Sequence, residues 1–206
     1  MSTKVKAKYL SLFLSINLLI YFLIQNHVTR NEYDLMTELD HAIPFMPEYI
    51  WVYHSIVPVI GAAAILLLKS RRAFFTTLWS FILATVVLNF FYLYFPSFYP
   101  RGELEPTTIS EIVVEVTRKI DGANNTFPSG HVCFAWLMYW GIFFSEAARN
   151  FRGLRSLFCL WAIGISLSTL VLKQHYIIDV GSGFALATIS FFMVKTIIEN
   201  RKFYEE

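Results

Sequence analysis

The chain of 206 residues is 56% hydrophobic and only 16% charged, with a net charge of +2. Its mean hydropathy of +0.51 lies outside the range of soluble globular domains and indicates a membrane protein. No basic cluster alternates with aromatic residues, so the composition excludes nucleic-acid binding. The length allows six short membrane spans and little else. We therefore predict a single integral membrane domain, residues 1–206, of the all-α class.

Six apolar runs, taken in chain order, predict a polytopic bundle of six transmembrane helices. Their expected limits are Tyr9–Ile24, Tyr49–Leu68, Ala73–Phe95, His131–Ser145, Leu157–Leu172 and Val180–Ile198. Several of these spans are shorter than the about 20 apolar residues that a helix usually needs to cross a bilayer.

Lysine and arginine residues are distributed unequally between the two sides of such a bundle. If the N-terminus is cytoplasmic, the segments on that side contain Lys4, Lys6, Lys8, Lys69, Arg71, Arg72, Arg149, Arg152, Arg155, Arg201 and Lys202. The opposite segments contain Arg30, Arg101, Arg118, Lys119 and Lys173. Basic residues favour cytoplasmic loops, so we expect both termini in the cytoplasm and the protein in the plasma or inner membrane.

The first outer loop, Asn26–Glu48, contains several acidic residues and His41. It lacks the tight His or Cys spacing of a metal site, so we interpret it as a solvated loop and expect no metal ligands in this chain.

The next outer segment, Thr107–Asp121, is too charged to cross a bilayer. Thr108 and Glu111 have the spacing of a capping box. An apolar stripe at helical spacing follows, formed by Ile109, Ile112, Val113, Val116 and Ile120. The segment predicts a short amphipathic helix on the outer face, over or beside a site. A helix that only covers protein is the alternative.

The start of the fourth predicted span, Thr126–His131, has the features of a phosphate-binding turn. Pro128 fits the chain just ahead of a helix, Ser129 offers an N-cap hydroxyl, and Gly130 lets backbone N–H groups approach an anion closely. Helix N-termini bind phosphate readily. His131 then lies in the first turn, where it can exchange a proton with a group bonded to that phosphate. Taken alone, the motif fits equally well a loop whose histidine faces headgroup water.

A second histidine follows about forty residues later, at the end of the fifth span. His175 and Asp179 are four residues apart, so on a helix they share a face and the carboxylate can bond one ring nitrogen. The other nitrogen is then free to act as a nucleophile. The predicted topology brings six polar residues to the outer ends of spans three to six, namely Arg101, Ser129, His131, Lys173, His175 and Asp179.

These two stretches resemble the phosphatidic acid phosphatase type 2 superfamily, which also includes the vanadium haloperoxidases. Pro128, Ser129, Gly130 and His131 agree with the second motif of that family, Pro-Ser-Gly-His. The third motif is Ser-Arg followed by a His and then an Asp four residues later. It agrees at Ser168, His175 and Asp179, but Thr169 occupies the arginine position.

The first motif of the family, a Lys with Arg-Pro seven residues later, is absent in that form. The segment Phe95–Arg101, which ends in Pro-Arg, stands in its place. This variant and the sequence Lys-Gln-His-Tyr at residues 173–176 are similar to the corresponding motifs of the branch near inositol phosphorylceramide synthases.

The resemblance implies a lipid phosphate phosphatase, a membrane-embedded hydrolase of phosphoric esters that works at the outer membrane surface through a phosphohistidine. His175, oriented by Asp179, would attack phosphorus, and His131 would protonate the departing alcohol and then activate the acceptor. Arg101, Ser129 and Gly130 would hold the phosphoryl oxygens. We infer that Lys173 replaces the missing arginine, and that these groups supply enough positive charge for catalysis without a metal or other cofactor.

Two other functions remain open at this point. A lipid phosphotransferase similar to inositol phosphorylceramide synthases would pass the phosphoryl group to an alcohol instead of water. The departures in the first and third motifs would also suit a non-catalytic phospholipid-binding or transport protein. The expected partners are a lipid phosphate and the membrane, and the sequence does not define an oligomeric state.

Overall fold

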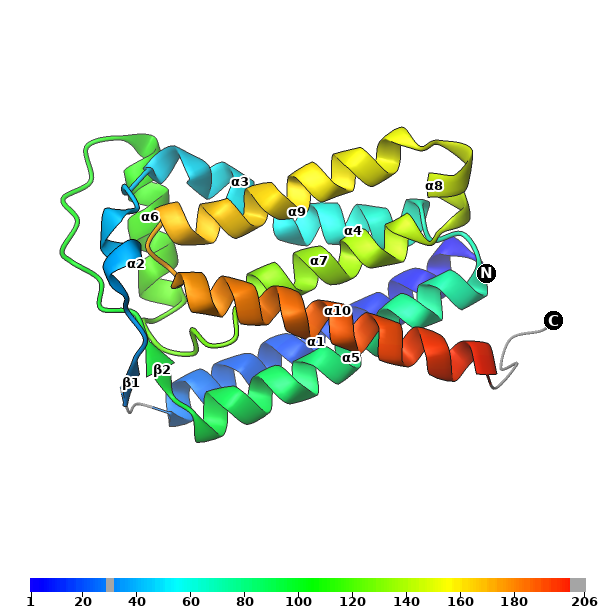
Figure 1. Cartoon of the computed structure of the whole chain (residues 1–206), viewed down its shortest axis with the longest axis horizontal. Helices are drawn as coiled ribbons and strands as arrows, with labels where there is room; N and C mark the ends of the chain where they lie inside the picture. The colour runs from blue at the N-terminus through cyan, green and yellow to red at the C-terminus, as the bar shows by residue number, and fades with distance from the viewer. Residues whose placement is uncertain (29–31, 201–206) are drawn as a thin grey trace.

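The structure, a computed structural model, describes residues 1–28 and 32–200 and is largely helical (Figure 1). Its helices are α1 (Thr3–His27), α2 (Glu38–Ala42), η1 (Pro47–Tyr49), α3 (Ile50–His54), α4 (Ile56–Leu66), α5 (Arg71–Tyr94), α6 (Ile109–Ile120), α7 (Gly130–Phe143), α8 (Glu146–Asn150), α9 (Gly153–Val171) and α10 (Ile177–Asn200). Two short strands, β1 (Tyr33–Asp34) and β2 (Ser97–Phe98), pair in parallel. The predicted basic positions Arg30, Arg201 and Lys202 lie outside the described residues.

Five helical segments of the described chain are long and apolar enough to cross a membrane, which is consistent with an integral membrane protein. They are Thr3–His27, Pro47–Leu66, Arg71–Tyr94, Gly153–Val171 and Ile177–Asn200. Each begins two or more residues before the predicted span. At α5, for example, the Ser70 hydroxyl accepts a hydrogen bond from Ala73 N at 3.0 Å, so the helix includes the charged Arg71 and Arg72.

The remaining predicted span corresponds to α7, which has 14 residues. At about 1.5 Å per residue, a helix of that length measures about 21 Å, less than the hydrocarbon thickness of a bilayer. This helix lies in the middle of the bundle, where it contacts α4, α5, α9 and α10 (Figure 1). The count of six spans therefore stays a prediction.

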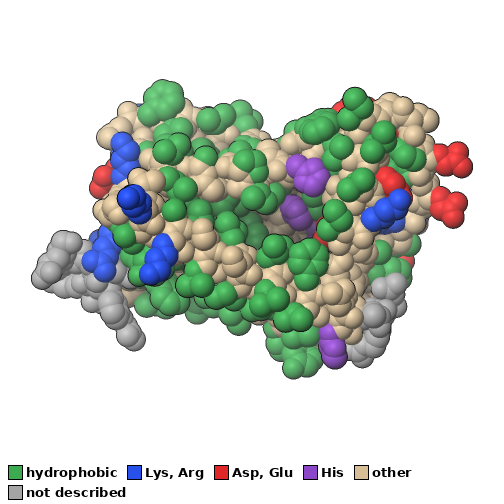
Figure 2. Space-filling view, turned by 180° about the vertical axis from the view of Figure 1, so that it is seen from behind, with side chains coloured by type: hydrophobic (Ala, Val, Ile, Leu, Met, Phe, Trp, Pro, Cys, Tyr) green, Lys and Arg blue, Asp and Glu red, His purple; other side chains and the backbone are tan. Residues whose placement is uncertain are grey.

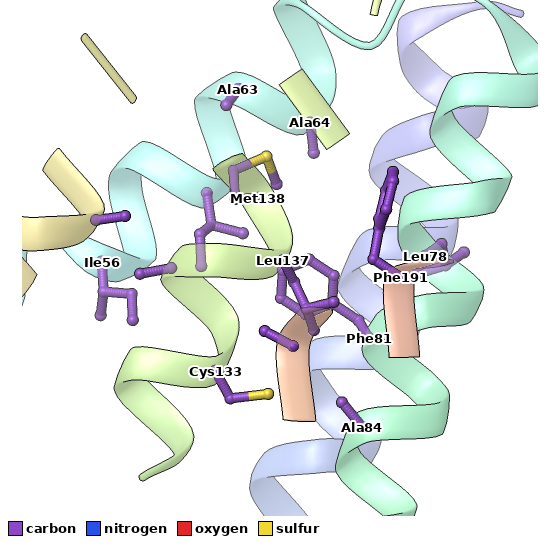
Figure 3. Close-up of a cluster of buried hydrophobic side chains, with 14 of the residues drawn as sticks. Ile56, Ala63, Ala64, Leu78, Phe81, Ala84, Cys133, Leu137, Met138 and Phe191 are labelled. Carbon is purple, nitrogen blue, oxygen red and sulfur yellow. The ribbon is translucent and has the colours of Figure 1, made fainter. Parts of the chain in front are cut away.

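The core is formed by apolar side chains of α7 and of the helices packed around it. Figure 3 shows Ala64 of α4, Phe81 of α5, Leu137 and Met138 of α7, and Phe191 of α10. All five are at most 5% exposed. Burial of these side chains fixes the position of α7, and with it the predicted phosphate-binding turn at the N-terminus of α7.

The segments between the long helices form a cap at one end of the bundle. Figure 1 shows α2, α6 and the two strands at this end, while α8 and the start of α1 lie at the other end. In the cap, β1 pairs with β2 in the register Tyr33 to Ser97, and Tyr99 N donates to Ala123 O at 2.8 Å. The cap brings parts of the chain that are distant in sequence to the N-terminal ends of α7 and α10.

Helix α6 occupies most of the predicted amphipathic segment, and both hydrogen bonds of the Thr108–Glu111 capping box are present. Its buried residues are Val114 and Thr117, on the side that faces η1 and α3. The exposed fraction is 50% or more for Ile109, Ile112, Val116 and Ile120. Most of the predicted stripe therefore does not cover protein, and its contact with a membrane stays a prediction.

The interpretation of Asn26–Glu48 as a solvated loop was wrong at Asp40, which is 2% exposed. Its carboxylate accepts hydrogen bonds from Thr37 N at 2.9 Å and from Ile177 N at 2.8 Å. Burial alone would raise the pKa of Asp40, but these bonds and the charge of Lys173 outweigh it, and the pKa is lowered. This residue therefore links α2 to the start of α10.

Candidate active site

A cavity of about 370 Å³ extends between α1, α4, α5 and α7. Most of its walls are apolar, with Leu14, Ala64 and Phe81 among the lining residues. Its end at the cap is polar and is lined by Arg101, Asp121, Asn125, His131, Gln174 and His175. Figure 2 shows a hollow in this side of the molecule, bordered by hydrophobic side chains, with histidine side chains at its edge.

His175 lies in the turn between α9 and α10 rather than on a helix. Its Nδ1 atom is 2.9 Å from the carbonyl oxygen of Thr126 and 3.4 Å from Oδ2 of Asp179. Because both neighbours of Nδ1 are acceptors, the proton belongs on Nδ1, and the lone pair of Nε2 is available on the other side of the ring. The predicted contact between His175 and Asp179 is present, with a main-chain carbonyl as the closer partner.

The two motif segments are bonded directly to each other. Ser129 N donates to the carbonyl oxygen of Asp179 at 3.0 Å. Close to this bond, a Cβ atom on Gly183 would lie 2.6 Å from the carbonyl oxygen of Ser129. A residue without a side chain at position 183 is therefore required for the N-terminus of α7 to approach α10 so closely.

His131 lies in the first turn of α7, with its ring centroid 6.4 Å from that of His175. The ring stacks on Tyr53 of α3 at a centroid distance of 4.1 Å. The Tyr53 hydroxyl is 3.4 Å from Nδ1 of His131. The two histidines thus line the same cavity from different segments, close enough for one bound group to contact both.

Arg101 enters the polar end from the loop that precedes α6. Its Nη2 donates to Oε1 of Gln174 at 2.5 Å, and its Nη1 donates to the carbonyl oxygen of Arg118 at 3.3 Å. Burial lowers the pKa of the Arg101 guanidinium, while the nearby Asp121 acts to raise it. Arginine remains charged despite such shifts, so this side chain places a positive charge beside the histidines.

Three buried polar groups at this end have no hydrogen-bond partner among the described residues: Nε of Arg101, Nε2 of Gln174 and the side-chain amide of Asn125. Asn125 is 4% exposed and has a φ of 60°, in the left-handed region. Unpaired buried polar groups are rare in proteins, and a bound ion is one explanation for them. Backbone conformations such as that of Asn125 occur preferentially at active sites and ligand sites. Together these donors could hold an anion. Sequence reasoning missed Gln174 and Asn125, although each directly precedes a predicted site segment.

Lys173 does not contribute to the polar end of the cavity, which corrects the prediction that it replaces the missing arginine. It takes a left-handed backbone conformation, with φ 56°, in the turn that ends α9. Its Nζ donates to the carbonyl oxygen of Asp40 at 2.9 Å. Burial lowers the pKa of Lys173, while Asp40 acts to raise it. The turn that brings Gln174 and His175 to the cavity therefore directs the lysine to α2.

Two other predicted phosphate ligands occupy different positions. Gly130 lines the cavity, where its backbone can face a bound group. Ser129 is fully buried, and its hydroxyl accepts a hydrogen bond from Val132 N at 3.4 Å as the N-cap of α7. The described residues that line the cavity include neither Ser129 nor Asp179, which lies behind His175. Among the described residues, no group of three or more His, Cys, Asp or Glu side chains could hold a metal ion.

The chain matches a known family. The family described as the PAP2 superfamily matches residues 96–203, which include both histidines, Arg101 and the cap segments between them. No curated protein gives a significant match to the chain.

Proposed function

Because this chain belongs to the PAP2 superfamily, whose members are generally phosphoesterases or phosphotransferases, we propose that it is a metal-independent lipid phosphate phosphatase. It would hydrolyse a phosphate monoester through a phosphohistidine on His175, at the outer surface of the membrane.

The observation that carries this proposal is the continuity between the apolar cavity and its polar end. On α5 the lining residues extend from Phe74 to Tyr92, eighteen residues apart. At about 1.5 Å per residue this is roughly 27 Å along the helix axis. A long apolar cavity with a few convergent polar groups suits a hydrocarbon chain with a charged head. A lipid phosphate would place its chain between α1, α4 and α5 and its phosphate between the two histidines.

In the first step, Nε2 of His175 attacks phosphorus and the bond from phosphorus to the ester oxygen breaks. The proton on Nδ1 stays between the Thr126 carbonyl and Asp179, whose charge stabilises the positive ring. Nε2 of His131 gives a proton to the departing alkoxide, so the alcohol leaves neutral.

In the second step, the now neutral His131 removes a proton from water as the water oxygen attacks the phosphohistidine. The bond between phosphorus and Nε2 of His175 breaks, inorganic phosphate forms, and both histidines return to their starting protonation states. An alcohol in place of water would make the reaction a phosphotransfer.

The phosphoryl oxygens would be held by Arg101, the backbone N–H of Gly130 and the unpaired amides of Gln174 and Asn125. Removal of one such donor from a buried anion site typically costs about 100- to 1,000-fold in rate. Ser129 would act indirectly, because its hydroxyl caps the helix whose N-terminus faces the phosphate.

The proposed orientation follows the basic residues. Lys4, Lys8, Arg71 and Arg149 belong to α1, α5 and α8 near the end of the bundle opposite the cap (Figure 1). The positive-inside rule places that end in the cytoplasm, and the cap and catalytic groups on the extracytoplasmic side.

A substrate panel tests the function. Purified protein in detergent is incubated with lipid phosphates, with a matched soluble phosphate monoester without a chain, and with lipid phosphates plus an alcohol acceptor such as inositol. We expect free phosphate from the lipid phosphates, much slower release from the soluble ester, and unchanged rates in excess chelator. A new phospholipid would identify a phosphotransferase. The absence of both products would favour a phospholipid-binding protein. Activity that is lost in chelator and restored by magnesium would contradict the metal-independent mechanism.

A further inference from the structure

Tyr53 and Asp121 form a second hydrogen-bonded chain that ends on His131. Tyr53 is 2% exposed on α3, and its hydroxyl lies between Oδ2 of Asp121 at 3.3 Å and Nδ1 of His131 at 3.4 Å. The mechanism above gives neither Tyr53 nor Asp121 a role.

Asp121 is the C-cap residue of α6 and lines the cavity. Its Oδ1 accepts a hydrogen bond from the Tyr21 hydroxyl of α1, and its Oδ2 accepts one from Tyr53 of α3. Three elements distant in sequence therefore meet at this carboxylate. Both oxygens of Asp121 are used by hydroxyl donors, so its charge is directed to the tyrosines and away from the phosphate position.

A tyrosine hydroxyl donates one hydrogen bond and also accepts. With its proton directed to Asp121, Tyr53 presents a lone pair to Nδ1 of His131. Nδ1 then carries the ring proton, and Nε2 is the nitrogen that exchanges protons with substrate. The distance of 3.4 Å is long, but catalytic hydrogen bonds often shorten only when substrate is bound.

We propose that Tyr53 and Asp121 are positioning residues that fix the ring orientation and tautomer of His131. This inference rests on the proposed role of His131 as acid and base. The other titratable groups near the paired rings are His54, which follows Tyr53 on α3, His175, Arg101 and Tyr92. The Tyr92 hydroxyl donates to the carbonyl oxygen of Pro128 at 3.0 Å. His54 bonds Thr117 at 2.9 Å and His175 bonds Thr126, so the polar contact to Nδ1 of His131 comes from Tyr53.

The competing explanation is that Tyr53 only packs, since its ring belongs to a small apolar cluster with Ile50, Val114 and Leu172. Tyr53→Phe separates the two explanations, because it keeps the ring and its stacking and removes the hydroxyl. The matched control is Tyr139→Phe, which removes a hydroxyl from a half-buried tyrosine on the same helix as His131.

We expect Tyr53→Phe to lower kcat for a lipid phosphate by about 10- to 100-fold, part of the 100- to 10,000-fold that general acid–base catalysis contributes. The formation of phosphohistidine from p-nitrophenyl phosphate should change by less than about 3-fold, because that leaving group needs little protonation. Asp121→Asn should show the same contrast between substrates. In a His131→Ala background, Tyr53→Phe should cause almost no additional loss of kcat. The effects of substitutions at residues that act through one group are not additive.

Equal losses on both substrates, or a full additional loss in the His131→Ala background, would assign Tyr53 a purely structural role and overturn the inference. Activity of Tyr53→Phe equal to that of the Tyr139→Phe control would do the same. These outcomes differ from failure of the proposed function, in which the wild-type protein itself releases no phosphate and carries no phosphohistidine; that result would remove the inference as well.

Discussion

At the scale of single residues, the proposed nucleophile His175 has two hydrogen-bond acceptors beside one ring nitrogen. The Thr126 carbonyl is the closer partner of His175 Nδ1, at 2.9 Å, and Asp179 is at 3.4 Å. The carbonyl oxygen fixes the tautomer regardless of which side chain occupies position 179. The role left to Asp179 is to stabilise the charge that develops on the ring.

This division of roles predicts a moderate effect for Asp179→Asn. A hydrogen bond to a charged group contributes about 1.5–3 kcal/mol, so kcat should fall about 10- to 100-fold. His175→Ala should abolish turnover of every substrate, because no phosphohistidine can form. Steady-state kinetics with an aryl phosphate, together with mass spectrometry of rapidly quenched digests, compares the two variants. An Asp179→Asn protein as inactive as His175→Ala would show that the carboxylate, not Thr126, sets the tautomer.

Gln174 and Lys173 provide a second comparison between neighbouring residues. Gln174→Ala removes an unpaired amide from the cavity and leaves Nη2 of Arg101 without its acceptor, so we expect KM for lipid phosphate to rise about 10-fold. Lys173→Ala should leave KM within about 2-fold of wild type, because its amine bonds the Asp40 carbonyl away from the cavity. A larger effect from Lys173→Ala than from Gln174→Ala would restore the lysine as the phosphate ligand.

The sequence identified the residues whose chemistry is recognisable in isolation. Arg101, His131, His175 and Asp179 could be predicted from type and spacing, and the structure brings them together. Tyr53, Asp121, Asn125 and Gln174 could not, because such polar residues are common in loops and helices. Their relevance depends on the cap, whose folding is set by long-range contacts that a local pattern does not record.

At the scale of helices, the approach of α7 to α10 holds the site together. The short contact is at Gly183, where a Cβ would lie 2.6 Å from the Ser129 carbonyl oxygen. Residue type alone does not distinguish Gly183 from Gly181, which lies two residues earlier on the same helix. A Cβ at Gly181 would have no heavy atom within 4 Å.

Two glycine substitutions on α10 therefore form a matched pair. Gly183→Ala should destabilise the protein by about 1–3 kcal/mol through overpacking, and it should lower activity by moving His175 away from His131. Gly181→Ala should be neutral or stabilising by up to about 1 kcal/mol, because alanine is the better helix former. Thermal unfolding in detergent and phosphate release measure both effects. Equal stability of the two variants would show that α7 and α10 can separate without cost.

At the scale of the whole molecule, hydropathy located α7 to within two residues, but it does not show whether this short helix crosses the membrane. A span that faces lipid must be apolar over its full length, which makes it visible in the sequence. A central helix such as α7 faces mainly other helices, and its length of 14 residues depends on its neighbours. Whether α7 counts as a sixth span determines on which side of the membrane the later segments lie.

Cysteine labelling tests the orientation directly. Exposed positions are needed, so Glu105 is suited to the outer side and Asn150 to the inner side. Single cysteines are introduced there in a background that lacks Cys133 and Cys159, and intact cells are treated with a membrane-impermeant thiol reagent. We expect Glu105→Cys to react from outside and Asn150→Cys to react only after the membrane is permeabilised, because basic residues retain the end of the bundle that contains α8 in the cytoplasm. The reverse pattern would place the two histidines on the cytoplasmic side. Labelling of both positions from outside would contradict a span between them, and with it the assignment of α7 as a membrane-crossing helix.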